Sequence, residues 1–309
     1  MTSRRTILTW LAAALALPAH AGAAPPSAFH RVYDDQALRD RFFLFLQNIF
    51  HLFPEDRFHQ LIIDQVHAHA TDPEIYRGIA AGLPDIKPFA SELTYAIPAL
   101  KKQKSEMARQ AAHYLQDVAR VDGYLEMGTT GRYVRSLGQR VELVGPLYVL
   151  NDTSPSFGPV DVIERGTPRK LGAFVPMGVY DPVGAAAVPD ASLDVVCNFI
   201  GFHHCPPDKL GDFVSSLRRA LRPGGRLLVR EHDVVDPEMD AFVALAHDVF
   251  NVGVGLSWDD NAGQRRHFRS VVGWTALLEG HGFTRTAGTV TQAHDPTDNA
   301  LLQFVKRGA

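Results

Sequence analysis

The chain has 309 residues, of which 46% are hydrophobic and 21% are charged, and its formal net charge is −3. This composition is typical of an ordinary globular protein and excludes a disordered or fibrous one. The near balance of 31 basic and 34 acidic residues argues against nucleic acid held by bulk electrostatics, and two cysteines are too few for a disulfide scaffold or an all-cysteine zinc site.

The first 24 residues resemble an export signal. Arg4 and Arg5 precede an apolar run that ends at Pro18, and Ala19-His20-Ala21 then offers the small-x-small pattern of a cleavage site. The segment around the arginine pair also resembles the twin-arginine signal, which serves proteins that fold before export. We expect an exported, periplasmic mature chain. An inner-membrane anchor, or a cytoplasmic protein if the signal does not function, stays open.

Residues 25–104 are predicted to form a helical cap or lid. Four apolar residues follow the spacing of one helical face: Phe42, Leu46, Ile49 and Phe53. The pattern predicts a turn at 82–84 and a second helix at about 98–118. The cap either seals the main core or forms an apolar wall for a substrate. Beyond the first 24 residues, no apolar run approaches the about 18 residues of a membrane span, so we expect no membrane contact for the mature chain.

Short apolar strands alternate with helices from residue 123 onward. The predicted strands cover residues 124–127, 147–150, 173–175, 193–198 and 226–230. Strands separated by helices demand a parallel sheet with crossover connections. The chain then closes with a helix at 272–279 and two strands near 284–290 and 301–305, which we expect to pair antiparallel. The predicted fold class is therefore α/β: a doubly wound, Rossmann-like, mostly parallel sheet with a C-terminal antiparallel hairpin and an N-terminal helical cap.

Glycines and polar side chains follow the predicted strands. Open parallel sheets bind ligands at the carboxyl ends of their strands. Gly128 and Gly131 follow the first strand, where glycine lets a backbone approach a ligand closely. Asp152 follows the second strand, where a carboxylate could accept both hydroxyls of a ribose. The fourth and fifth strands are followed by Asn198, His203, His204, Glu231, His232 and Asp233.

Three segments around the fourth and fifth strands carry a family resemblance. Residues 188–196, 202–204 and 217–227 resemble class I S-adenosylmethionine-dependent methyltransferases, closest to the branch with small-molecule and quinone methyltransferases. The resemblance covers about residues 105–306, and residues 105–309 are accordingly assigned to a methyltransferase-like domain. It implies an enzyme that moves a methyl group from S-adenosylmethionine to a small-molecule acceptor.

The resemblance also implies cofactor contacts. In the family, the loop after the first strand holds the methionine portion, which maps to Glu126, Gly128 and Gly131. Asp152 maps to the residue that binds ribose. Tyr180 and Asp181 occupy the stretch that contacts adenine. The family loop usually runs acidic-x-Gly-x-Gly-x-Gly; here Thr130 stands at the second glycine, which predicts a reshaped loop without a left-handed backbone there. Thr130 and Asn198 are assigned to the same cofactor site, where Asn198 could also orient a substrate.

Methyl transfer needs alignment, and a base only when the acceptor carries a proton. His203, His204 or His232 is the candidate base, because histidine titrates near neutrality. The histidine pair could instead be structural. Residues 251–270 are interpreted as a loop over the pocket, where Arg265, Arg266 or Arg269 receives an anionic group or forms a solvated turn.

Two other functions stay open. The five residues His203, His204, Glu231, His232 and Asp233 could converge as metal ligands, although no tight ligand spacing supports this and we assign no metal. An exported protein could also keep the fold, lose turnover and bind a nucleoside-like or apolar ligand. The partner in each case is a small molecule; oligomeric state is not readable from the sequence.

Overall fold

The computed structural model describes residues 27–88, 91–286 and 288–308. The predicted export signal at residues 1–24 lies outside the described residues. The chain divides into two compact units. Of the described residues, the helical unit contains those within 27–101, 234–268 and 293–298, and the sheet unit contains those within 102–233, 269–292 and 299–308.

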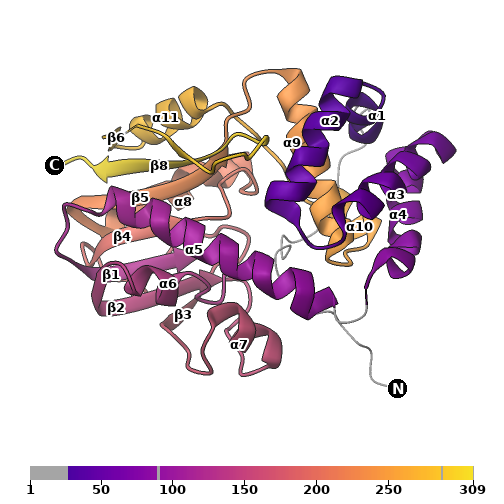
Figure 1. The fold of residues 1–309 in the computed structure, drawn as a ribbon. Helices are drawn as coiled ribbons and strands as arrows, with labels where there is room; N and C mark the ends of the chain where they lie inside the picture. The colour runs from indigo at the N-terminus through magenta and orange to yellow at the C-terminus, as the bar shows by residue number, and fades with distance from the viewer. Residues whose placement is uncertain (1–26, 89–90, 287, 309) are drawn as a thin grey trace. The chain divides into compact units, whose positions relative to one another are not determined.

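The sheet unit is built on an eight-stranded sheet with the strand order β3-β2-β1-β4-β5-β8-β6, and β7 pairs with β8 (Figure 1). The strands are β1 Arg120–Met127, β2 Glu142–Asn151, β3 Ala173–Pro176, β4 Leu193–Asn198, β5 Leu221–His232, β6 Phe283–Arg285, β7 Val290–Thr291 and β8 Asn299–Lys306. β1 to β5 pair in parallel, whereas β8 runs antiparallel to β5, β6 and β7. The predicted α/β Rossmann-like fold with antiparallel C-terminal strands is confirmed.

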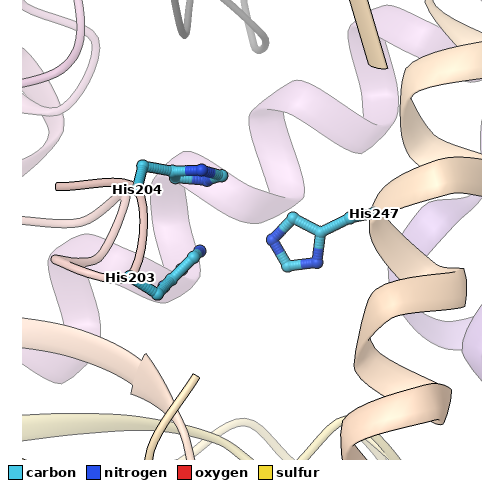
Figure 2. Close-up of side chains that lie close together, drawn as sticks. All are labelled: His203, His204 and His247. Atoms are coloured by element: carbon cyan, nitrogen blue, oxygen red, sulfur yellow. The ribbon is translucent and has the colours of Figure 1, made fainter. Parts of the chain in front are cut away.

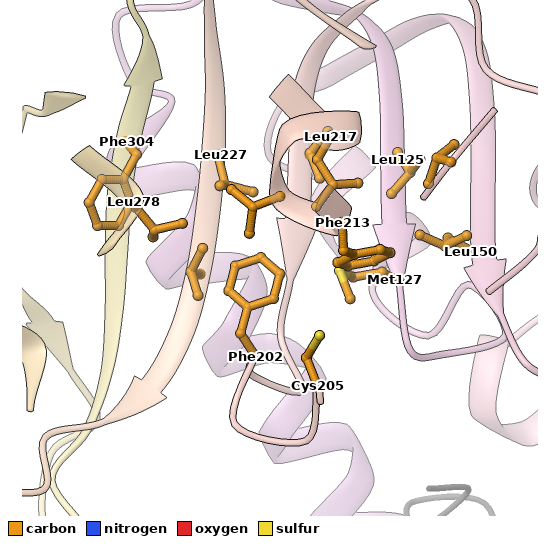
Figure 3. Packing of buried hydrophobic residues seen from close by; sticks show 14 of the residues in the cluster. Leu125, Met127, Leu150, Phe202, Cys205, Phe213, Leu217, Leu227, Leu278 and Phe304 are labelled. Atoms are coloured by element: carbon orange, nitrogen blue, oxygen red, sulfur yellow. The ribbon is translucent and has the colours of Figure 1, made fainter. Parts of the chain in front are cut away.

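Helices cover both faces of this sheet because successive strand residues point to opposite sides. α8 (Pro207–Ala220) and α11 (Val271–Gly280) pack with alternate residues of the central strands, in a core that includes Leu125, Phe213 and Leu227 (Figure 3). The other face meets residues of α5 (Ile97–Tyr114) and α6 (Val134–Gly138). α7 (Pro159–Arg165) lies in the connection from β2 to β3.

The helical unit contains α1 Ala28–Tyr33, α2 Gln36–Phe45, α3 Glu55–Ala68, α4 Asp72–Ile86, α9 Pro237–Gly253 and α10 Trp258–Ala262, with π-helical turns at Leu46–Phe50 and Glu92–Ala96. Phenylalanines dominate its core. The ring of Phe42 lies 5.3 Å from the ring of Phe242 on α9 and 5.7 Å from that of Tyr33. Across the described residues, no helix is both long enough and apolar enough to cross a membrane.

Two predictions for the N-terminal region need correction. The cap is not limited to residues 25–104, because residues 234–268 belong to the same compact unit. The predicted turn at 82–84 is wrong, because α4 continues through Pro84 to Ile86. A proline in the last turn of a helix removes only one backbone hydrogen bond, and the helix then ends ahead of Pro88. Of the predicted apolar face, Phe42, Leu46 and Phe53 are buried.

Candidate functional site

The carboxyl ends of β2, β1 and β4 lie side by side at one edge of the sheet. Met127 at the end of β1 is in register with Leu150 on β2 and with Asn198 on β4. The backbone N–H of Gly128 donates to the carbonyl of Leu150 at 2.8 Å. The structure therefore brings the glycine loop (residues 128–131), Asp152 and Asn198 together.

Glu126 holds the glycine loop through hydrogen bonds. Its buried carboxylate accepts hydrogen bonds from the hydroxyl of Thr129, from the backbone N–H of Tyr133 at 3.1 Å and from the hydroxyl of Tyr124 at 3.2 Å. The hydroxyl of Thr129 accepts bonds from the N–H groups of Gly131 and Arg132, both at 3.1 Å. Burial raises the pKa of Glu126. Both carboxylate oxygens of this predicted cofactor residue are thus engaged within the loop and its strand.

The two loop glycines, Gly128 and Gly131, differ in how closely other side chains surround them. Both have left-handed backbones, with φ of 75° at Gly128 and 92° at Gly131. A Cβ on Gly128 would overlap the side chain of Ile200, so protein packing already fills that space. A Cβ on Gly131 would meet no described atom closer than 3.6 Å. That Cβ would make ordinary contacts with the side chains of Leu171, Val149 and Arg165, so Gly131 is less tightly constrained by its neighbours than Gly128.

Thr130 occupies the second glycine position without a left-handed backbone, as predicted. Its hydroxyl donates to Oε2 of Glu164 on α7 at 2.8 Å. Nε of Arg132 donates to Oε1 of the same carboxylate at 2.6 Å. Glu164 is a site residue that the sequence did not predict. Its position far along the chain, inside a short helix, gives no spacing signal that would have found it.

Asp152 and Asn198 each carry a buried polar atom without a partner. Oδ1 of Asp152 receives no hydrogen bond from any described residue, and burial raises the pKa of this carboxyl to about 6. Asn198 accepts bonds at Oδ1 from the N–H groups of Ile200 and Gly201, at 3.3 and 3.1 Å. Its Nδ2 finds no acceptor within the described part of the chain. Buried polar atoms in folded proteins nearly always have partners, so a ligand or an ordered water is expected to complete these two.

Asp181 lies apart from these buried groups. Its carboxylate is exposed and accepts a bond from Nζ of Lys209 at 2.7 Å. The neighbouring Tyr180 has a left-handed backbone, with φ of 54°, and its ring packs edge-on against Phe213. In the structure, Asp181 therefore forms an ion pair with Lys209 at the surface.

The three predicted histidines gather at the ends of β4 and β5. Nδ1 of His203 lies 2.7 Å from Oε2 of Glu231, whose Oε1 accepts the backbone N–H of Phe202. The ring of His203 lies 4.2 Å from that of His204 and 5.9 Å from that of His232. Figure 2 shows His203 and His204 on the loop after β4; His247, also drawn, belongs to α9. Burial raises the pKa of Glu231 well above its usual range.

The structure gives two of the five alternative metal ligands other hydrogen-bond partners. Glu231 is bonded to His203 and Phe202, and Oδ1 of Asp233 accepts the backbone N–H of Val271 at the start of α11. The carboxylate of Glu231 therefore orients the loop after β4, and that of Asp233 helps to begin α11.

The proposed anion-binding arginines also have structural roles. Arg266 donates to Oδ1 of Asp248 and to Oδ1 of Asn261, both at 2.7 Å, inside the helical unit. The guanidinium of Arg269 lies over the ring of Trp274. The segment at 251–270 is partly helical, since α10 lies within it. The prediction that Arg266 receives an anionic group is corrected, because its charge is already paired.

Residues 125–229, from β1 into β5, match the family model described as a methyltransferase domain. No curated protein sequence matches the chain. The chain is similar to the solved structure of 1,6-didemethyltoxoflavin-N1-methyltransferase from Burkholderia thailandensis, with 16% identity, a TM-score of 0.46, and coverage of 78% of this chain and 92% of that one.

Two further solved structures are similar in the same way. An O-methyltransferase family protein from Burkholderia thailandensis has 12% identity and a TM-score of 0.44, with 91% of this chain and 73% of that chain covered. Mitomycin 7-O-methyltransferase has 15% identity and a TM-score of 0.44, with 92% and 74% covered. The assignment therefore depends on the family match and on the strand order of the sheet. Residues 125–229 match a methyltransferase domain, and the sheet to which they contribute has the α/β Rossmann-like fold.

Proposed function

We propose that this protein transfers a methyl group from S-adenosylmethionine to a small-molecule acceptor that loses a proton in the reaction. The observation that carries the proposal is a pair of buried atoms, Oδ1 of Asp152 and Nδ2 of Asn198, that have no hydrogen-bond partner among the described residues. A carboxylate acceptor and an amide donor suit the hydroxyls and the polar atoms of a nucleoside.

Three residues would hold the cofactor. Asp152 would accept the hydroxyls of its ribose, which supplies the donors that Oδ1 lacks. Asn198 would donate from Nδ2 to a polar atom of the cofactor, and the backbone of Gly131 would border its methionine portion. Asp181 remains a proposed contact to adenine, and that contact would compete with its bond to Lys209.

The chemistry divides between the cofactor and the chain. When bound, S-adenosylmethionine supplies an electrophilic methyl group on a sulfonium. The chain aligns the acceptor and takes its proton. Glu231 holds the imidazole of His203 through Nδ1, and this imidazole is the proposed base for the acceptor's proton. The rings of His204 and His232 lie next to His203 and shape the surroundings of that base.

Calorimetric titration with S-adenosylmethionine and with its demethylated product tests the cofactor site. We expect micromolar binding by the native chain and loss of binding in Asp152→Ala. Asp190→Ala is the control, because it removes an aspartate that pairs with Arg219 and precedes β4, at the other end of the strand from Asn198. Absence of binding by the native chain at millimolar ligand would refute the proposal, and equal affinity in Asp152→Ala would refute the assignment of Asp152.

A further inference from the structure

α7 carries three charged residues that are almost completely buried: Asp161, Glu164 and Arg165. Two of them hold the segment that follows Asp152. Oδ2 of Asp161 accepts the backbone N–H of Ser156 at 2.5 Å, and Nη2 of Arg165 donates to the carbonyl of Ser156 at 2.8 Å. This face of the helix therefore fixes the chain just beyond the proposed ribose contact.

The third residue, Glu164, holds the glycine loop. Its two carboxylate oxygens accept bonds from Thr130 and from Arg132, on either side of Gly131. Its backbone carbonyl also accepts a bond from Nζ of Lys104 at 2.6 Å. The guanidinium of Arg132 is itself buried, so this carboxylate is the charge that allows it to stay there.

We propose that Glu164 is a positioning residue for the cofactor. It fixes the glycine loop through Thr130 and Arg132, and α7 thereby joins this loop to the segment after Asp152. The inference rests on the proposed function. A glycine has more backbone freedom to lose than any other residue, so a loop that contains two of them binds a ligand more tightly when side chains on either side order it beforehand. In this chain a threonine, an arginine and one distant carboxylate provide that order.

The test compares Glu164→Gln with Asp194→Asn. Asp194 also accepts bonds from an arginine, Arg222, and from a backbone N–H, that of Asp122, both at 2.7 Å, but it stands at the amino end of β4, away from the proposed site. We expect Glu164→Gln to raise the Kd for S-adenosylmethionine at least tenfold and to speed amide hydrogen exchange of residues 128–133 in the free protein. Asp194→Asn should lower the melting temperature while leaving both quantities unchanged.

Thr130→Val provides a second variant that leaves no unpaired charge. It removes one donor to Glu164 and should raise the same Kd two- to fivefold. If Glu164→Gln does not fold, this variant decides the question. Suppose that the native chain binds the cofactor and that the variant that folds binds it with the same affinity. That result would overturn the inference and leave the proposed function standing. Absence of cofactor binding by the native chain would overturn both.

Discussion

Burial raises the pKa of Asp152 to about 6. The carboxyl lies just after β2, and its Oδ1 accepts no hydrogen bond from any described residue. Hydroxyl donors favour the charged form of a carboxyl group. A ligand that brings two hydroxyls to this residue therefore lowers its pKa, and binding in acid must release a proton. Cofactor affinity and pH are linked at this one side chain.

We expect the Kd for S-adenosylmethionine to fall as the pH rises from 5 to 7 and to level off above the pKa of Asp152. Below that pKa the affinity should drop by up to about tenfold per pH unit, since one proton is displaced. Calorimetry at several pH values measures this slope, and Asp152→Asn should abolish it along with most of the affinity.

The same pKa fixes the sign of the effect on stability. Because the folded pKa lies above the unfolded value, this carboxyl favours the native state in acid and disfavours it as the pH rises through about 6. Asp152→Asn should therefore melt no lower than the native protein at pH 7. A variant that melts lower there would contradict this account of Asp152.

The two loop glycines allow a matched pair of substitutions. A left-handed backbone costs an alanine about 1–2 kcal/mol at either position, but only at Gly128 does the added methyl also overlap Ile200. Gly128→Ala should therefore reduce the free energy of unfolding by more than Gly131→Ala does. Gly131→Ala should mainly weaken cofactor binding. Denaturant unfolding and calorimetry separate the two losses.

A second substitution tests the cause at Gly128. Ile200→Ala removes the atoms that an added Cβ would overlap, so the double variant should be more stable than the sum of the single losses predicts. Strictly additive losses would show that the contact with Ile200 is not the reason for the glycine.

For single residues, the sequence predicted where a side chain lies in the fold better than it predicted which groups that side chain contacts. Glu126, Asp152 and Asn198 all lie at the carboxyl ends of strands, as the strand pattern predicts. Nothing local in the sequence indicates that the oxygens of Glu126 are engaged by Thr129, Tyr133 and Tyr124. Such partners depend on three-dimensional packing rather than on spacing along the chain.

Among the elements, β4 was predicted at its observed bounds because a short buried strand between turns has a clear pattern. The placement of α9 could not be predicted in the same way. Its residues Phe242, Val249 and Val252 indicate that the helix is buried, but periodicity does not say against what. In the structure α9 completes the core of the helical unit, together with helices from the start of the chain.

A double-mutant cycle on Phe42 and Phe242 tests this pairing of α2 with α9. Each change to alanine should cost about 3–5 kcal/mol of unfolding free energy, because each ring is fully buried. The coupling between the two rings should be about 0.5–1.5 kcal/mol, as expected for an edge-to-face pair. Phe58→Ala, in the same core but outside this pair, provides the control for general loss of packing. Zero coupling would contradict the assignment of α9 to the helical unit.

Over the whole molecule, three segments of the helical unit alternate along the chain with three segments of the sheet unit. Neither unit is a continuous piece of sequence: the core of the helical unit includes residues as far along the chain as Phe268, and that of the sheet unit includes residues up to Phe304. The twin-arginine hypothesis requires folding before export, which would also let the protein bind its cofactor where that cofactor is made.

We propose accordingly that Arg4 and Arg5 direct the folded protein out of the cytoplasm, and that cleavage follows near Ala21. In a Gram-negative host, the native chain should be recovered from the periplasmic fraction, shortened at its N-terminus as judged by mass spectrometry. Replacing both arginines by lysine keeps the positive charge but removes the twin-arginine motif, so the variant should stay in the cytoplasm at full length. Replacement of Arg31 and Arg39 by lysine should leave export unchanged, because these residues lie in α1 and α2 of the folded protein. Periplasmic recovery of the Arg4 and Arg5 double variant would contradict the twin-arginine route, and full-length native chain in the cytoplasm would contradict export itself.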